Sequence, residues 1–144
     1  MKRILVLVCL VLFLGTFISA EYAAAAERFV NNNDGTVTDT QTNLMWADKD
    51  NNSNINWYGA QSYCGGYSGG GKTGWRMPTI AELGQLYNSG AFGNVIQKTS
   101  SYGQVWSADA SSDSAAFFNF STGKSGYDYP SIGKYLALPV RSAK

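Results

Sequence analysis

The chain of 144 residues contains no histidine and only two cysteines. Without histidine there can be no Ser-His-Asp or Cys-His nucleophile, and no zinc site of the usual histidine-containing type. Asp48 and Asp50 form the nearest pair of carboxylates, but in so polar a stretch a solvated surface is a simpler interpretation than an acid–base pair. We therefore expect no catalytic residue, no metal site and no cofactor.

The chain also lacks an excess of either sign of charge. It has 11 Lys and Arg residues and 10 Asp and Glu residues, which gives a net charge of +1. A nucleic-acid ligand requires a basic stripe or patch, whereas the basic residues of this chain are scattered singly. They include Arg28, Lys72, Arg76, Lys98, Lys124, Lys134 and Arg141. We expect no nucleic-acid partner.

Long hydrophobic runs are absent except at the start of the chain. Lys2 and Arg3 precede an apolar stretch over 4–18, and small residues follow it. This pattern predicts a secretory signal peptide at 1–26, with cleavage after Ala20 or Ala26. The stretch is shorter than the ~20 residues that span a bilayer. We expect no stable membrane span after cleavage, and a single domain at 27–144 outside the cytoplasm.

One cysteine, Cys9, lies inside the predicted signal peptide, so only Cys64 remains after cleavage. Asn56 can cap a helix over 57–64, which the glycine pair after Cys64 would end. On that helix Cys64 shares a face with Trp57 and Ala60, which favours burial of the thiol. Pairing with another chain is the alternative.

The most informative stretch is 74–79, together with Glu82. Pro78 holds the preceding residue extended, and Thr79 and Glu82 have the spacing of a capping box. Apolar residues then recur at helical spacing, which predicts a helix over 80–87 with one buried face. Arg76 lies among residues of the buried type, which favours a structural hydrogen-bond hub over an anion ligand.

Short strand-like segments flank these two helices. A hairpin with a turn at 33–35 opens the domain. Further strands are predicted at 44–46, 105–107, 116–120 and 135–140, and exposed loops at 48–54, 88–104, 109–114 and 122–134. The glycine-rich run 66–73 formally matches a phosphate-binding loop, but a helix precedes it and an extended path follows, so we interpret it as a connector. The fold class predicted is α+β, with two helices, short antiparallel strands and long loops.

The ordered set of motifs resembles the DUF1566 family, also called the Lcl C-terminal domain family after a bacterial collagen-like adhesin. The residues that carry the resemblance are the 33–40 hairpin, Trp46, Trp57, Ala60, Cys64, Trp75, Arg76, Pro78, Thr79, Glu82, Leu83, Trp106, Asn119, Phe120, Val140 and Arg141. They span essentially the whole chain after the predicted signal peptide. The resemblance implies a C-type-lectin-like fold and a secreted, periplasmic or bacterial cell-surface location. In the adhesin it also implies binding of sulfated polysaccharides.

The chain departs from related patterns at several points. Members of the family often carry a cysteine just after the terminal Val-Arg, able to pair with the cysteine of the first helix, but here Ser142 stands in that place. We therefore expect Cys64 to have no partner within the chain. The proline flanked by an acid or amide and the Trp-Asn-Asp triplet of calcium-dependent C-type lectins are missing, as is the cysteine pair of the related formylglycine-generating enzymes. These departures favour a non-catalytic module.

Tyrosines among small polar residues in the predicted loops are typical of surfaces that recognise a glycan or a protein. The predicted ligand-binding residues are Tyr102, Asp109, Asp113, Lys124, Tyr127, Asp128 and Tyr129. The alternative is that these loops are merely solvated and that their tyrosines anchor them. We expect a secreted, adhesin-like module that binds a carbohydrate or a cell-surface protein. A structural or interaction subunit of an envelope or appendage assembly is the alternative.

Overall fold

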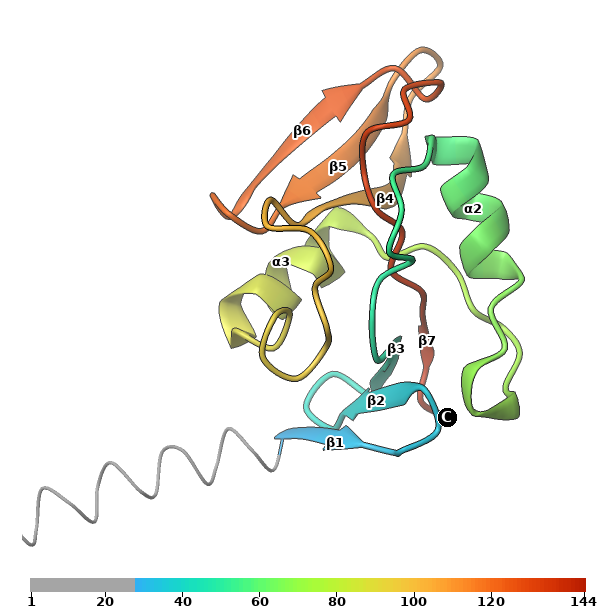
Figure 1. Cartoon of the computed structure of the whole chain (residues 1–144), viewed down its shortest axis with the longest axis vertical. Helices are drawn as coiled ribbons and strands as arrows, with labels where there is room; N and C mark the ends of the chain where they lie inside the picture. Colours follow the sequence, from blue (N-terminus) through green and yellow to red (C-terminus); the bar gives the residue numbers. More distant parts are fainter. Residues whose placement is uncertain (1–27) are drawn as a thin grey trace, which may run out of the picture.

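The computed structural model describes residues 28–144, and the predicted signal peptide lies outside them. Two small antiparallel sheets and two helices make up the described part of the chain (Figure 1). In chain order the elements are β1 (Phe29–Asn31), β2 (Thr36–Asp39), β3 (Leu44–Ala47), α2 (Trp57–Gly65), a 3-10 turn (Gly69–Gly71), α3 (Ile80–Ser89), β4 (Gln104–Ala110), β5 (Ala115–Asn119), β6 (Lys124–Asp128) and β7 (Val140–Ser142). This architecture confirms the predicted α+β class with two helices. None of these helices is long and apolar enough to cross a membrane.

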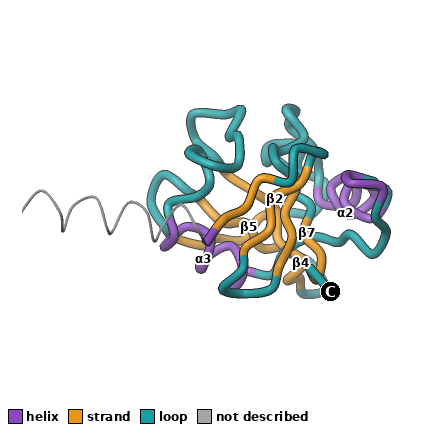
Figure 2. Tube along the Cα trace, turned by 90° about the horizontal axis from the view of Figure 1, so that it is seen from below, coloured by secondary structure: helices purple, strands orange, loops and turns teal. Residues whose placement is uncertain are grey.

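The first sheet has the strand order β1-β2-β3-β7, so the last strand of the chain pairs with the third, with Val140 opposite Trp46. The second sheet is formed by consecutive strands in the order β4-β5-β6. In Figure 1 the second sheet lies above the first, with α3 below β5. Figure 2 shows the two helices on opposite sides of the strands.

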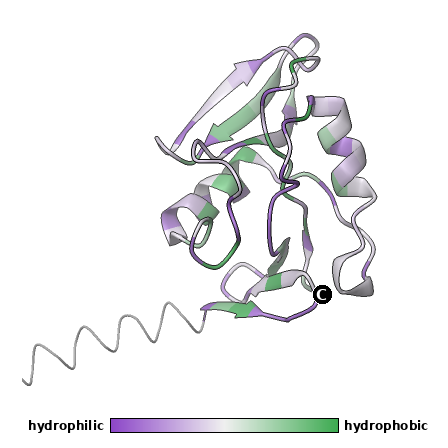
Figure 3. Ribbon diagram, in the orientation of Figure 1, coloured by the Kyte–Doolittle hydropathy of each residue, from purple (hydrophilic) through white to green (hydrophobic). Residues whose placement is uncertain are grey.

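Two clusters of buried side chains form the core. The larger one joins both sheets to α3 and contains Trp46, Leu83 and Phe118. The smaller one joins α2 to the second sheet and contains Cys64 and Trp106. Figure 3 shows the consequence for the second sheet, in which β5 is hydrophobic and β6 largely hydrophilic. The outer strand of that sheet therefore faces solvent.

Both predicted helix starts are confirmed. The Asn56 side chain accepts a hydrogen bond from the Gly59 amide at 2.8 Å and caps α2. Thr79 and Glu82 form the capping box of α3, each side chain accepting from the backbone amide of the other. The helix ends at Gly90, whose φ of 69° places it in the left-handed region that glycine adopts without strain.

Two secondary-structure predictions near the end of the chain are wrong, one of a loop and one of a strand. The predicted loop 122–134 contains β6, whose sequence Lys-Ser-Gly-Tyr-Asp has no apolar alternation because it is the outer strand of its sheet. Conversely, only Val140 of the predicted strand 135–140 belongs to one, β7. The residues before it are apolar because they are buried, and two of them make isolated bridges, Tyr135 with Ile55 and Leu136 with Val105.

The predicted exposed loop 48–54 is wrong at Asp50, whose side chain lies in the interior and is 1% exposed. Its carboxylate accepts hydrogen bonds from the Thr99 amide at 2.8 Å, from the Thr99 hydroxyl and from the Asn52 amide at 2.9 Å. These donors replace water and make burial of the carboxylate tolerable. The loop is therefore fastened to the segment around Thr99.

Candidate functional site

The pairing of the second sheet separates the predicted ligand-binding residues into two groups. Lys124 lies opposite Asn119, and Asp128 lies opposite Ala115, at the two ends of β6. Four steps along a strand span about 13 Å. Tyr102 belongs to the Lys124 end, because its carbonyl accepts a hydrogen bond from the Ser121 hydroxyl at 2.8 Å in the turn before β6. Tyr102 and Lys124 thus lie far from the other predicted ligand-binding residues.

The other five predicted residues lie at the opposite end of the sheet, where β4 turns into β5. The pairing of Ala110 with Ala115, and of Ala115 with Asp128, brings these strand ends together. The predicted loop 109–114 is shorter than expected, because its first two residues belong to β4. The five residues are Asp109, Asp113, Tyr127, Asp128 and Tyr129.

A further tyrosine, Tyr58, lies at this end and was not predicted. The amide of Trp57, the first residue of α2, donates to the Pro130 carbonyl at 2.9 Å, so the helix start adjoins the segment after β6 (Figure 1). Tyr58 is 57% exposed. Its place in the sequence could have revealed it, because helical periodicity turns position 58 away from the buried face of α2.

We call the end of the domain that carries Tyr58, Asp113, Tyr127, Asp128 and Tyr129 the tyrosine surface. Tyr127 lies opposite Ala116 and Asp128 opposite Ala115, so their side chains leave opposite faces of β6. Tyr127 is 68% exposed and Tyr129 is 69% exposed. Neither ring anchors its segment in the core, so the alternative interpretation of these tyrosines as loop anchors does not apply to them. Tyr102, at the other end of the sheet, is equally exposed.

Two of the predicted aspartates have partners inside the domain. Asp109 accepts from the Ile80 amide at 2.7 Å, at the start of α3, where a negative charge is favourable. Asp128 accepts from the Tyr135 hydroxyl at 2.8 Å and from the Tyr129 amide at 2.9 Å. The Tyr135 hydrogen bond lowers the pKa of Asp128, while burial, with Asp128 adding to it, raises the pKa of Tyr135 to about 12. Asp128 is therefore ionised at neutral pH and holds the backbone of Tyr129.

Arg76 is the hydrogen-bond hub that its sequence context predicts. Its two terminal nitrogens donate to the two carboxylate oxygens of Glu82 at 2.9 and 2.7 Å, and one of them also donates to the Met77 carbonyl. Burial alone would raise the pKa of Glu82, but hydrogen bonds from Arg76 and Thr79 outweigh it and lower the pKa. The hydrogen bond to Glu82 also raises the pKa of Arg76. Both members of the pair are therefore ionised, and two hydrogen bonds hold the guanidinium against the carboxylate.

Two clefts lie beside α2, and neither was predicted. The first, which we call the α2 cleft, has a volume of about 430 Å³ and lies between the helix and the segment leading to α3. Its lining residues are Trp57, Gln61, Gly65, Trp75, Arg76, Met77, Thr79 and Ala108. It thus brings motif residues of α2 and of the 74–79 stretch to one surface.

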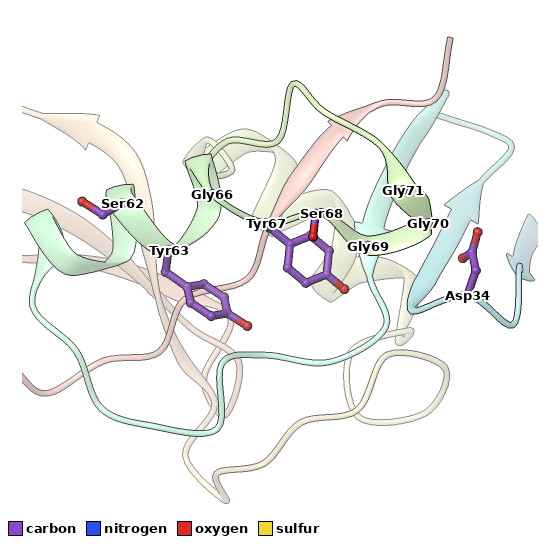
Figure 4. Close-up of a pocket in the computed structure, with 9 residues that line it drawn as sticks. All are labelled: Asp34, Ser62, Tyr63, Gly66, Tyr67, Ser68, Gly69, Gly70 and Gly71. Atoms are coloured by element: carbon purple, nitrogen blue, oxygen red, sulfur yellow. The ribbon is translucent and has the colours of Figure 1, made fainter.

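The second cleft, of about 700 Å³, lies along the glycine-rich turn after α2 (Figure 4). Tyr63 and Tyr67 line it from α2 and the turn, and Asp34 lines it from the first hairpin. The Tyr67 hydroxyl donates to the Gly35 carbonyl at 2.7 Å, which fastens the turn to the first sheet. An extended segment, and no helix, follows the turn. This confirms the prediction that the glycine-rich run is a connector and not a phosphate-binding loop.

Cys64 is buried and free of any disulfide in the described part of the chain. Burial raises the pKa of its thiol to about 12, so it is protonated at neutral pH and unreactive as a nucleophile. Within residues 28–144, no three Asp, Glu or Cys side chains converge to hold a metal ion. The prediction of a buried thiol is confirmed.

Comparison with known proteins gives one result that identifies the chain. No curated protein matches it. The family model of the Lcl C-terminal domain matches residues 35–141, from the turn between β1 and β2 to the middle of β7. That range contains both helices, the α2 cleft, the tyrosine surface and every lining residue of the second cleft except Asp34. The chain therefore belongs to the Lcl C-terminal domain family.

Proposed function

We propose that this chain is a secreted, non-catalytic module that recognises a carbohydrate or another cell-surface ligand in the manner of an adhesin. In this proposal it has a C-type-lectin-like fold and acts in the periplasm, in the medium or on the bacterial surface. Membership of a family named after an adhesin supports the proposal. The single observation that carries it is the exposure of Tyr58, Tyr127 and Tyr129 at one end of the domain.

Tyrosine suits ligand recognition because its ring offers a large contact area, its hydroxyl can donate and accept hydrogen bonds, and few torsions are lost on binding. Tyr127 belongs to β6 and Tyr58 to α2, so both backbones are held by secondary structure. Asp128 fixes the backbone of Tyr129. The backbones that carry these tyrosines are therefore fixed in advance, which lowers the entropic cost of binding.

A glycan array on the chain without residues 1–26 tests this function. Replacement of Tyr127 and Tyr129 together by alanine should weaken binding to the captured glycan roughly tenfold or more, because both rings would lie at the contact. Tyr102→Ala is the matched control, since that ring is equally exposed but lies at the other end of the sheet. Thermal melts of all three proteins should coincide.

Two results would contradict the tyrosine surface as the site. One is full binding by the double variant. The other is equal loss in the double variant and in Tyr102→Ala. A double variant that melts far below the wild type would mean that these rings support the fold instead of contacting a ligand.

One observation favours the alternative function, an interaction subunit of an envelope or appendage assembly. β6 is the outer strand of its sheet, so one row of its backbone groups has no strand partner among the described residues. Such an edge can pair with a strand of another subunit. Cross-linking mass spectrometry on native envelopes tests this, since assembly would place Lys124 of β6 next to another subunit. Lys72, in the connector before Trp75, serves as the comparison site.

A further inference from the structure

One side of the α2 cleft is formed by the ring of Trp57, whose orientation is fixed by a hydrogen bond. Trp57, Gln61 and Gly65 are spaced by four residues and lie along one face of α2. The indole N–H of Trp57 donates to the Ser107 carbonyl at 2.8 Å, which orients the ring, while the side chain is only half-buried. At Gly65 no atom lies within 4 Å of the position that a side chain would take. A ligand can therefore reach a flat apolar surface that is already in place.

The cleft also offers polar groups with hydrogen-bonding capacity to spare. In the described part of the chain, neither Nε of Arg76 nor the side-chain amide of Gln61 has a hydrogen-bond partner. The Arg76 side chain is 46% exposed. Its guanidinium is nevertheless rigid, because the bidentate pair with Glu82 fixes its plane. One planar donor and one amide thus face the same hollow as the indole.

The charge of this hollow decides between ligand classes. Glu82 already neutralises Arg76 through two hydrogen bonds of 2.9 and 2.7 Å. A sulfate or carboxylate would have to compete with that pair or approach the negative charge of Glu82, so an anion gains little. Hydroxyl groups, in contrast, can accept from Nε of Arg76 and exchange hydrogen bonds with Gln61 without breaking the pair.

We propose that the α2 cleft binds a neutral pyranoside, with the C–H face of the sugar on Trp57 and its hydroxyls on Arg76 and Gln61. The inference rests on the proposed binding function and adds a second site, which adjoins the tyrosine surface because the ring of Trp57 lies 5.6 Å from that of Tyr58. A volume of about 430 Å³ falls within the range of about 300–1,000 Å³ typical of small-molecule sites. The aromatic platform with planar polar groups at its edge matches a ring that has one apolar face and a polar rim.

NMR titration of the isotope-labelled chain without residues 1–26 tests this directly. The probes are methyl glycosides of glucose, galactose and mannose, methyl N-acetylglucosaminide and, for comparison, a heparin tetrasaccharide. We expect at least one neutral glycoside to shift the indole N–H signal of Trp57 and the side-chain signals of Gln61 and Arg76, with saturation at millimolar concentration. Heparin should leave these three signals unchanged.

Variants then assign the site. Gln61→Ala should weaken binding of that glycoside roughly fivefold, the effect of losing one hydrogen bond. Gln85→Ala is the matched control, because Gln85 is an exposed glutamine on α3 outside the cleft. Ala108→Phe should abolish binding by filling the cleft from β4, where Ala108 is exposed, without altering Trp57, Gln61 or Arg76.

The outcomes separate this inference from the proposed function. If no neutral glycoside moves the three signals, or if heparin alone does, the cleft is not a neutral-sugar site. Glycan binding that depends on Tyr127 and Tyr129 would then still support the adhesin-like function. If Ala108→Phe keeps its native spectrum and still binds the glycoside, the sugar lies elsewhere and the inference fails.

Discussion

At the residue scale, three carboxylates of this domain are occupied by neighbouring donors instead of water. Asp39, Asp50 and Glu82 each accept several hydrogen bonds and lie wholly or partly buried. Glu82 serves two elements at once, because the oxygen that caps the Thr79 amide also binds Arg76. Asp50, whose sequence context predicts a solvated charge, thus has a structural role.

Thr79→Ala should lower the free energy of unfolding by about 1 kcal/mol, because the Thr79 hydroxyl accepts from the Glu82 amide at 3.2 Å and the variant leaves that amide without its cap. Urea denaturation measures the loss. Thr73→Ala is the control, since Thr73 is exposed and its hydroxyl has no partner among the described residues. Equal stability of the two variants would mean that the cap formed by the Thr79 hydroxyl contributes nothing.

Cys64 should be unreactive in the folded chain and fully reactive once it is unfolded. Burial raises the pKa of the thiol to about 12 and also blocks access to it. A chromogenic disulfide reagent at pH 8 should therefore find no thiol in the native protein. In denaturant, without prior reduction, it should find one thiol per chain after removal of residues 1–26. Fast reaction of the native protein would show that the smaller core cluster opens readily.

At the element scale, tight turns set the geometry of the second sheet and hence of the site. The turn between β5 and β6 ends at Gly123, whose φ of 69° is disfavoured for residues with a side chain. A Cβ at this position would also lie 2.6 Å from the ring of Tyr87 on α3. The turn therefore depends on glycine for two independent reasons.

Gly123→Ala should destabilise the domain by about 1–3 kcal/mol, through the backbone strain and the contact with Tyr87. Gly133→Ala is the matched control. Gly133 has a negative φ and no atom within 4 Å of the added methyl group, so stability there should stay constant or rise by up to about 1 kcal/mol. Thermal melts compare the two. A neutral Gly123→Ala would mean that the turn can change its conformation.

At the scale of the whole molecule, the segment before and within β7 connects the parts of the domain. Leu136 bridges to Val105 of β4, Val140 bridges to Arg76, and β7 pairs with β3 of the first sheet. The chain end thus holds both sheets and the stretch before α3 together. Paired charges add to this at two places, Arg28 with Asp39 and Arg76 with Glu82.

Acid should destabilise the molecule through these two pairs. Burial raises the pKa values of Asp39 and Glu82, but the hydrogen bonds that their carboxylates accept lower them by more. Both pKa values therefore lie below their ordinary values. The unfolded chain therefore binds more protons at mildly acidic pH. The stabilisation is complete above about pH 5 and is lost as the pH falls through the unfolded values near 4 and then the lower folded values.

Urea titrations at a series of pH values measure this loss. The double variant Asp39→Asn, Glu82→Gln should be less stable than the wild type at pH 7 but should show a flatter dependence on pH below 5. Identical slopes in the two proteins would assign acid destabilisation to other groups. High salt should weaken the contribution of Asp39 only slightly, because Asp39 is almost completely buried, and that of the Arg76–Glu82 pair more, because the Arg76 side chain is 46% exposed.

Local signals in the sequence specify the parts of the domain that depend on near neighbours. Asn56 and Thr79 start the helices because a cap acts through residues three positions away. Trp46, Trp75 and Trp106 enter the core because so much apolar area is buried there, and the family follows from the order of such motifs. The absence of histidine is likewise visible without any structure.

Contacts between distant segments decided the rest. Asp50 is buried because Thr99, far along the chain, supplies its donors, and β6 is a strand because β5 pairs with it despite its polar sequence. The pairing of β5 with β6 also separates Tyr102 from Tyr127 by the length of a strand. The start of α2, in contrast, brings Tyr58 to the end of the sheet where Tyr127 lies. The α2 cleft exists only because residues from α2, the 74–79 stretch and β4 meet. Such juxtapositions arise from tertiary packing and strand register, which no local pattern of residues encodes.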